Sequence, residues 1–454
     1  MLDFPEKIYD KILSLAIKHN FISHCREYPF FTLEQKLIPA SAVRRISDGN
    51  FKKQNFSCGL YIHFPFCKSR CAFCKYYAEN CFSPKIIDEY LWALNREIEL
   101  YGIDFSDIIL SNIYFGGGTP TLFSPNQIER LKNIIYKFFR FDEKTQISVE
   151  GTPESINSDN LKEWRELGIN RISLGCQSFN DDILKRVGRR HSVKTVFEAF
   201  DVIRKIGIKY TGIDVIFGLS GETLKTYENT VQSAIKLSPD FIECFLFTPG
   251  GRTKMKRFHP IGSDLDSVIR FFKESLTANG YRLYFSGNFL GFVKKSVIGT
   301  KAMNQNTEEV YNQRASCMGL GPSSISQFPQ IRYRTASSVA DYIKRIKKGL
   351  LPLHYGVFAK SDDLKRQYVI SRIGYYRNLP KKDYFNLFNV PIEHDFLREL
   401  QYLKRTGIVS ETKNNFIWHF NESEMGHRDF FLHVLRYWYA PRYIRKIAKQ
   451  FEIS

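Results

Sequence analysis

Short apolar runs alternate with longer amphipathic segments along most of the chain, from about residue 60 onward. A short apolar run bounded by turn residues is typical of a buried strand, whereas apolar residues at helical spacing predict an amphipathic helix. The predicted strands cover residues 60–63, 112–115, 147–150, 171–175, 211–217 and 241–247. The predicted helices cover residues 88–100, a stretch from about 124, residues 161–167, a helical pair that ends at 206, and residues 222–237.

This regular alternation of strand and helix indicates parallel βα units. Six such units are fewer than the eight of a closed barrel. The expected fold is therefore α/β, an open, partial (β/α)6 barrel over residues 56–290. In folds of this kind the chemistry takes place at the carboxyl ends of the strands, so we expect functional residues in the loops that follow them.

The two ends of the chain differ from this pattern. Residues 1–55 predict a helical lead-in, and residues 291–454 predict an α+β C-terminal domain that ends in a winged-helix-like module. The elements that indicate this module are a helix over 384–405 and strands over 408–409 and 416–418, joined by a turn at Asn414-Asn415. We interpret it as a packing module rather than a DNA-binding one. A basic amphipathic segment at 440–451 predicts a last helix that caps this domain, or that meets a membrane surface or a partner.

Composition narrows the class of protein. The 454 residues carry 66 Lys and Arg against 47 Asp and Glu, a formal net charge of +19, with 43% hydrophobic and 25% charged residues, which is ordinary for a globular chain. Lysine is spread along the whole chain and no nucleic-acid-binding signature occurs, so we expect no nucleic-acid partner. No run of eighteen apolar residues and no signal-peptide pattern is present, which predicts a cytoplasmic protein without stable membrane insertion.

Three of the nine cysteines fall within eight residues: Cys67, Cys71 and Cys74. An odd cysteine count without a signal peptide does not indicate a disulfide framework. Thiolates spaced so closely select zinc, copper(I) or an iron–sulfur cluster. Structural zinc requires four closed ligands, and Cys81 would be a fourth at an unusual spacing. Three thiolates on a [4Fe–4S] cluster leave one iron open, and the spacing favours this cluster over zinc, which stays the alternative.

The segment around these cysteines carries a resemblance to a known family. Tyr61-Ile-His63-Phe-Pro65-Phe-Cys67, followed by Cys71 and Cys74, resembles the cluster-binding segment of radical S-adenosylmethionine (SAM) enzymes, in particular the oxygen-independent coproporphyrinogen III oxidase family. Further matching segments follow in the same order: residues 115–120 (Phe-Gly-Gly-Gly-Thr-Pro), Glu150, residues 171–179, residues 188–191 and residues 214–223.

The resemblance implies a set of site residues. Cys67, Cys71 and Cys74 would bind a [4Fe–4S] cluster whose open iron chelates SAM, and an electron from a reductase or a flavodoxin-type donor would cleave the SAM. The resemblance implies that Gly117, Gly118 and Thr119 contact the methionine part of SAM and that Glu150 contacts its ribose or a neighbouring group. Gln177, Arg189 and Asp214 would also fix SAM. Tyr61 would pack near the cluster and SAM, and Phe73 would shield the cluster or stack near adenine. Of these, Tyr61, Glu150, Gln177 and Asp214 are the candidate catalytic residues. His63 and the cysteines Cys81, Cys176, Cys244 and Cys317 are interpreted as structural.

One position departs from the oxidases of this family. They carry a further cysteine two residues after the third cluster ligand, where this chain has Tyr76. The segments 307–312 and 318–325 resemble the heme-degrading and methyltransferase branch, in which Gly319 and Gly321 would give a backbone site for a second SAM or for substrate. The leading hypothesis is thus a class C-like methyltransferase that uses two SAM molecules on an sp2 carbon of a tetrapyrrole or another unsaturated scaffold. The alternatives are an oxidative decarboxylase and a non-catalytic heme chaperone.

Overall fold

The structure is a computed structural model. It describes residues 36–37, 39, 41, 57–80, 83–101, 108–247, 253–255, 265–286, 289–304, 315–328, 331–376 and 378–419. Most of the predicted lead-in, Cys81, the segment 307–312 and the predicted basic helix at 440–451 lie outside the described residues.

Within these residues, thirteen strands form one sheet in the order β1-β13-β12-β11-β10-β2-β3-β4-β5-β6-β7-β9-β8. Strands β2 to β7 pair in parallel, each with the next along the chain. Their bounds are β2 Ser57–Phe64, β3 Leu110–Gly117, β4 Gln146–Gly151, β5 Arg171–Gln177, β6 Tyr210–Phe217 and β7 Phe241–Leu246. These are the six strands of the predicted partial barrel, which confirms the α/β fold class.

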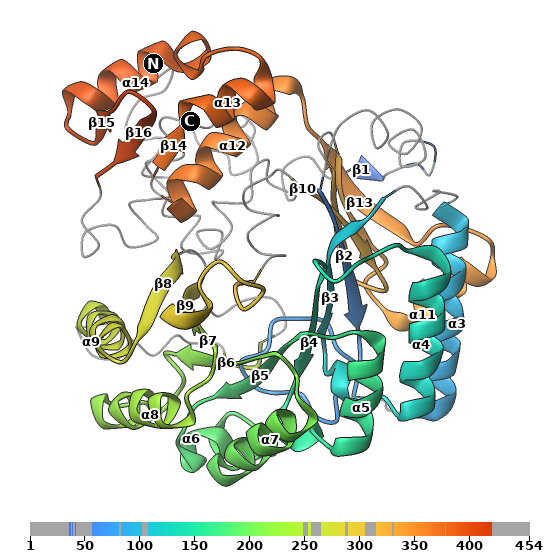
Figure 1. Ribbon diagram of the computed structural model, residues 1–454. Helices are drawn as coiled ribbons and strands as arrows, with labels where there is room; N and C mark the ends of the chain where they lie inside the picture. Colours follow the sequence, from blue (N-terminus) through green and yellow to red (C-terminus); the bar gives the residue numbers. More distant parts are fainter. Residues whose placement is uncertain are drawn as a thin grey trace.

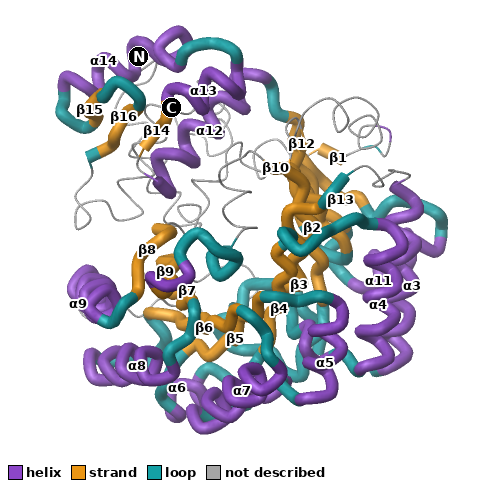
Figure 2. Tube along the Cα trace, viewed as in Figure 1, coloured by secondary structure: helices purple, strands orange, loops and turns teal. Residues whose placement is uncertain are grey.

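Helices cover the convex side of the curved sheet, as Figures 1 and 2 show. Their bounds are α3 Pro84–Tyr101, α4 Pro125–Phe138, α5 Ser158–Leu167, α6 Asp181–Arg186, α7 Val193–Ile206, α8 Leu224–Leu237, α9 Leu265–Ala278 and α11 Val339–Lys347. Local signals define their ends. Ser124 caps α4 in a capping box with Gln127, and Gly168 and Gly207 end α5 and α7 in the left-handed conformation. No helix in the described part of the chain is long and apolar enough to cross a membrane.

Further strands extend the sheet beyond both edges of the six-stranded part. Strand β10 runs parallel to β2, whereas β11, β12, β13 and β1 continue antiparallel, and β9 and β8 extend the other edge from β7. Their bounds are β1 Lys36–Leu37, β8 Tyr281–Ser286, β9 Phe289–Lys294, β10 Ala315–Leu320, β11 Ile325–Phe328, β12 Ile331–Thr335 and β13 Leu353–Phe358. The domain boundary proposed at residue 290 falls inside β9, so the two proposed domains share this sheet.

A smaller unit follows at the C-terminal side. It holds a three-stranded sheet of order β14-β16-β15 with three helices, an arrangement typical of a winged helix. Its elements are α12 Ser361–Tyr376, β14 Asn378–Pro380, α13 Lys381–Phe388, α14 Ile392–Arg405, β15 Val409–Glu411 and β16 Asn415–Trp418. The prediction of one helix over 384–405 was wrong. Asn389 ends α13 in the left-handed conformation, and Pro391 precedes α14.

Gly319 in β10 and Gly321 directly after it serve internal packing instead of an open ligand site. A Cβ atom on Gly319 would lie 2.4 Å from the backbone oxygen of Ile325, and one on Gly321 would lie 2.8 Å from that of His63. The N–H of Gly321 donates to Glu97 Oε2 at 2.9 Å, and the hydroxyl of Tyr342 donates to the same atom at 2.7 Å. The expectation that this pair exposes backbone groups to a second SAM is therefore corrected, because the close contact of β10 with β11 and β2 uses them.

Glu97 makes the stability of this packing depend on pH. Burial raises its pKa from 4.5 to about 7. Between these two pH values the folded state holds a proton that the unfolded state has lost, so the free energy of unfolding falls as pH rises through this window, by about 3 kcal/mol. Glu97→Gln stays neutral, and we expect its stability relative to the wild type to increase by about that amount from pH 5 to pH 8 in urea unfolding.

Glu99→Gln is the matched control on the same helix. Hydrogen bonds from Arg96 and Lys137 lower the pKa of Glu99, so its replacement gives no gain at high pH. An equal pH slope for Glu97→Gln and the wild type would contradict the assignment of this slope to Glu97.

Candidate active site

The cysteine loop follows β2 and is held to the body of the protein at both ends. The N–H of Cys67 donates to the carbonyl of Glu79 at 3.0 Å, and the N–H of Glu79 donates to Pro65 at 2.6 Å. The middle of the loop is tied to the segment after α6, because Ala72 donates to the carbonyl of Val187 at 2.9 Å. The loop thus has a defined path before any ligand is added.

The three thiols of the loop suit a group larger than a single ion. In the described residues, no three His, Cys, Asp or Glu side chains are arranged to hold one metal ion. Cys67, Cys71 and Cys74 are not in disulfides. Burial raises the pKa of Cys67 to about 11 and also raises that of Cys74. Buried thiols of this kind become thiolates when a metal centre supplies the compensating charge, so the donor set fits a cluster held on its three corners.

Two side chains from other parts of the chain contact these thiols, one after β3 and one after α6. The hydroxyl of Thr119 lies 3.6 Å from Cys67 Sγ, and Nη1 of Arg189 lies 3.5 Å from Cys71 Sγ. A second guanidinium nitrogen of Arg189 donates to the carbonyl of Gly175, at the end of β5. Thr119 and Arg189 therefore both contact the cysteine loop, although one follows β3 and the other follows α6.

Gly117 and Gly118 bring the end of β3 against the cysteine loop. A Cβ on Gly118 would lie 2.4 Å from the carbonyl oxygen of Phe66, and one on Gly117 would lie 2.6 Å from the ring of His63. Gly117 has a φ of +110°, a conformation that glycine adopts at little cost. Both N–H groups form hydrogen bonds within the protein. That of Gly117 donates to Glu150 Oε2 at 3.0 Å, and that of Gly118 donates to the carbonyl of Phe64 at 2.6 Å. Any contact with SAM would thus come from the carbonyl groups of this turn.

Glu150 is held by two donors at the end of β4. The hydroxyl of Tyr114 donates to Oε1 at 2.8 Å, and Gly117 donates to Oε2. Tyr114 stacks on Tyr61, with ring centroids 6.0 Å apart. Burial raises the pKa of Glu150 despite the two hydrogen bonds. The carboxyl group is therefore oriented at the candidate site, and a cationic ligand would favour its ionised form.

His63 is a structural partner of Tyr61 and not a metal ligand in this arrangement. Nε2 lies 3.0 Å from the carbonyl oxygen of Tyr77, which can only accept, so this nitrogen carries the proton. Nδ1 then accepts from the hydroxyl of Tyr61 at 3.1 Å. Burial lowers the pKa of His63 to about 4, which keeps the imidazole neutral and preserves this pattern. Tyr61 is thereby fixed beside Tyr114 and the cysteine loop.

Gln177 is the last residue of β5, and Asp214 lies in the middle of β6. Gln177 has a φ of +69°, beside a register shift between β5 and β6. A non-glycine residue in this conformation is strained, and such strain concentrates at functional sites. Asp214 Oδ1 accepts from the hydroxyl of Ser173 at 2.7 Å. Burial, and next the charge of Glu243, raise the pKa of Asp214 well above its usual value.

A buried ion pair that the sequence analysis missed underlies these residues. Arg171 Nη2 donates to Glu243 Oε1 at 2.6 Å, with side chains 0% and 5% exposed. Arg171 also donates to the carbonyl of Ala302 and lies over the ring of Phe241, 3.7 Å from its centroid. The signal was available, because Glu243 is a charged residue in the middle of the apolar run 241–247.

The remaining predicted residues have apolar surroundings. Phe73 packs with Ile183, Val187 and Leu219, on the side of the cysteine loop that faces α6. Cys176, Cys244 and Cys317 are buried, which agrees with their interpretation as structural residues. Cys58 in β2 is buried as well. Tyr76, at the position that departs from the oxidases, is 56% exposed.

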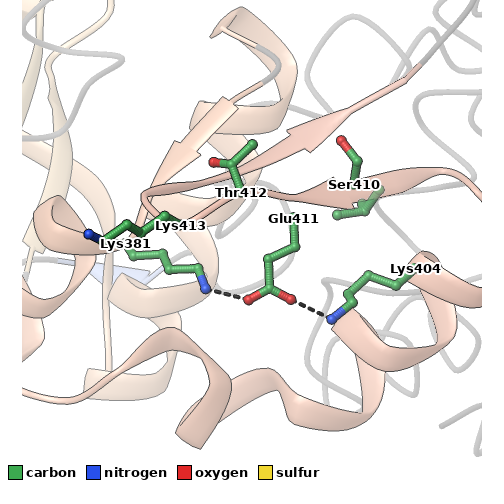
Figure 3. Close-up of a pocket in the computed structure, with 7 residues that line it drawn as sticks. Lys381, Lys404, Ser410, Glu411, Thr412 and Lys413 are labelled. Atoms are coloured by element: carbon green, nitrogen blue, oxygen red, sulfur yellow. Dashed lines mark hydrogen bonds and ion pairs between the residues drawn. The ribbon is translucent and has the colours of Figure 1, made fainter.

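A separate pocket lies in the C-terminal unit (Figure 3). It is lined by Lys381, Lys404, Val409, Ser410, Glu411, Thr412 and Lys413. Lys381 and Lys404 both bond to Glu411, and Lys381 also pairs with Glu393 at 2.9 Å. These lysines already have carboxylate partners, and no predicted site residue lines the pocket, so it does not belong to the candidate active site.

A partial barrel with a three-cysteine loop after its first strand is typical of one class of proteins. Comparison of the sequence with known families identifies that class. Residues 61–234 match the family model of the radical SAM superfamily. The chain is 36% identical over 184 residues to the heme chaperone HemW of Bacillus subtilis, a match that covers 40% of this chain and 48% of that protein. It is 26% identical over 379 residues to the oxygen-independent coproporphyrinogen III oxidase of Synechocystis sp., with 81% of each chain covered.

Residues 61–234 thus form a radical SAM domain, and the chain is similar to oxygen-independent coproporphyrinogen III oxidases and to HemW heme chaperones. Radical SAM proteins use a [4Fe–4S] cluster and SAM, which confirms the predicted cofactors. Among solved structures, coproporphyrinogen III oxidase (HemN) from Escherichia coli is similar, with a TM-score of 0.74, 22% identity and coverage of 93% of this chain and 96% of that one. At this identity the similarity shows the shared fold alone.

The pair of Arg171 and Glu243 makes a stability prediction. Arg171→Leu leaves a buried carboxyl without its partner, and we expect a loss of about 3–5 kcal/mol in urea unfolding. Replacing both partners by leucine removes the uncompensated charge, so the double variant is expected to recover part of this loss.

Arg130→Leu is the control for this comparison. Arg130 forms an ion pair with Asp88 in which the side chains are 46% and 51% exposed, and exposed pairs contribute at most about 1 kcal/mol. A double variant as unstable as Arg171→Leu would show that the buried charge is not the cause.

Proposed function

We propose that this chain is a radical SAM enzyme that acts on a carboxylated tetrapyrrole, with methyl transfer to an sp2 carbon as the leading reaction. The observation that carries the proposal is the contact of the cysteine loop with Thr119, directly after β3, and with Arg189, after α6, next to parallel strands that carry Glu150 and Asp214. When bound, the cluster and SAM would supply reductive cleavage of one SAM and, for methyl transfer, abstraction of hydrogen from the methyl group of a second SAM. The protein then has to bind, orient and enclose the reactants.

The charges of the site are complementary to SAM. Glu150, Asp214 and Glu243 are three carboxyl groups in one buried region, and Arg171 contacts only Glu243 among them. A cationic ligand lowers the cost of ionising Glu150 and Asp214, and SAM carries positive charge on its sulfonium and amino groups. Arg189, beside Cys71, suits the SAM carboxylate through charge-assisted hydrogen bonds.

The substrate class is proposed from the relatives and from charge. The related proteins are named for coproporphyrinogen and for heme. A net charge of +19 favours the approach of an anionic substrate. Tyr76, in place of the additional cysteine of the oxidases, is the observation against simple decarboxylation.

Heme carriage is the second candidate. The observation that favours it is the higher identity to a HemW chaperone, 36% over 184 residues. A carrier would bind heme and retain the cluster without turnover, so the two candidates differ in their small-molecule products.

The first test is product analysis of the protein reconstituted anaerobically with iron and sulfide, then given SAM, dithionite and coproporphyrinogen III. We expect 5′-deoxyadenosine by mass spectrometry, and S-adenosylhomocysteine with it if methyl is transferred. Cys71→Ala should abolish both products and reduce the iron content, whereas Cys58→Ala, which removes a buried thiol outside the loop, should retain them.

Other outcomes of this assay correct the proposal in defined ways. Formation of 5′-deoxyadenosine without S-adenosylhomocysteine would favour oxidative decarboxylation over methyl transfer. A full cluster with heme binding and neither product supports carriage. Zinc in place of iron at the loop would contradict radical SAM chemistry altogether.

The second test is the pH dependence of SAM affinity. Burial raises the pKa values of Glu150 and Asp214, with Glu243 adding like charge and Arg171 opposing it. If the bound cation favours their ionised forms, binding releases protons, and SAM affinity increases with pH below these raised pKa values. Calorimetry in buffers of different ionisation enthalpy measures this release directly.

Asp214→Asn is expected to reduce proton release and to flatten the pH dependence. Asp240→Asn is the control, since Asp240 bonds to the N–H of Thr211 at the opposite end of β6. SAM affinity that is independent of pH in the wild type would show that neither carboxyl changes its ionisation on binding.

A further inference from the structure

The inner face of the sheet continues from the candidate site onto β12. Partner residues in a β-ladder face the same side, so the register shows which side chains share this face. Tyr61 pairs with Tyr114 across β2 and β3, and with Gly319 across β10. Gly319 lies against Ile325 of β11, and Ile325 pairs with Arg334 of β12. Arg334 therefore lies in the same row of the sheet as the two stacked tyrosines.

Arg334 is partly buried without a compensating charge. Its side chain is half-buried, and its Nε is buried with no hydrogen-bond partner. Among the residues that the structure describes, its guanidinium contacts the ring of Tyr355, 5.9 Å from the ring centroid, and forms no hydrogen bond or ion pair. Removing a charge from water is costly unless an opposite charge compensates, so this position favours an anionic ligand.

The place of Arg334 links it to the candidate site. Arg334 shares the row of Tyr61 through β10 and β11, and its positive charge, after burial itself, lowers the pKa of His63 on the same face of β2. His63 accepts from Tyr61, and Tyr61 stacks on Tyr114. An anion at Arg334 would thus lie beside the Tyr61–His63 pair.

We propose that Arg334 binds a carboxylate of the substrate on the inner face of β12. The inference rests on the proposed function, because a carboxylated tetrapyrrole supplies such groups on its rim. A guanidinium binds a carboxylate through two parallel hydrogen bonds, and the ring of Tyr355 supports its face. SAM also has a carboxylate, but Arg189 lies beside Cys71 and suits that group, which leaves Arg334 for the substrate.

The experiment measures binding to the anaerobically reconstituted protein with two probes. Coproporphyrin III, with four carboxylates, is titrated by fluorescence quenching next to its tetramethyl ester, and SAM is measured by equilibrium dialysis. We expect Arg334→Gln to weaken coproporphyrin III binding by about tenfold or more, the loss of one charge-assisted contact. Binding of the ester and of SAM should be unchanged, and Arg334→Lys should retain part of the affinity.

Arg96→Gln is the matched control, because Arg96 pairs with Glu99 on the outer helix α3 and is 47% exposed. The iron content and SAM binding of Arg334→Gln report whether this variant is folded. Arg334→Lys keeps the positive charge, so its coproporphyrin III affinity tests whether that charge is what the substrate requires.

Three results would overturn the proposal. Equal coproporphyrin III affinity in Arg334→Gln and the wild type would show that Arg334 does not bind a substrate carboxylate, and the proposed function would be unaffected. Loss of SAM binding instead of porphyrin binding would assign Arg334 to the SAM carboxylate. Absence of porphyrin binding in the wild type would contradict both the proposed substrate class and the proposed role of Arg334.

Discussion

The parallel register of β2 to β7 is the constraint on which the site depends. Side chains alternate between the two faces of a strand, so a shift of one residue would move every inner group to the helix side. The observed register pairs Tyr61 with Tyr114, Tyr114 with Ser148 and Ser148 with Arg171, and it pairs Asp214 with Glu243 two inward-facing positions further along the strands. Residues far apart in sequence thereby form one polar inner face, and the glycines after β3 allow the cysteine loop to lie directly against it.

That inner face is poor in positive charge, and this imbalance connects stability to function. Burial alone disfavours the ionised forms of Glu150 and Asp214, and Arg171 compensates chiefly Glu243. A chain selected only for stability would replace such groups with apolar residues, since well-packed apolar substitutes are often neutral or stabilising. Retaining them is consistent with a ligand that brings positive charge. The strained φ of Gln177 at the adjacent strand end is a second cost of the same kind.

The sequence predicted the elements well where the signal was local. Apolar runs marked all six barrel strands, and the caps at Ser124, Gly168 and Gly207 marked helix ends, because these depend on neighbouring residues alone. The cysteine spacing and the strand-end residues indicated the cofactors. The break at Asn389 and Pro391 was missed because periodicity continues across it. Arg171 and Glu243 were missed because they are 72 positions apart, and only the register brings them together. The role of Gly319 and Gly321 likewise depends on strands that the sequence did not pair.

A continuous set of contacts joins Glu150 to His63, and this set depends on the neutral state of His63. Gly117 and Tyr114 hold Glu150, Tyr114 stacks on Tyr61, and Tyr61 donates to His63. A protonated imidazole could not accept from Tyr61 and would repel Arg334, so both the tyrosine pair and the arginine would shift. Desolvation lowers the pKa of His63 enough to prevent this near neutral pH. The neutral histidine therefore holds Tyr61 in place beside Tyr114, the tyrosine that donates to Glu150, so the protonation state of His63 is coupled to the orientation of that carboxyl group.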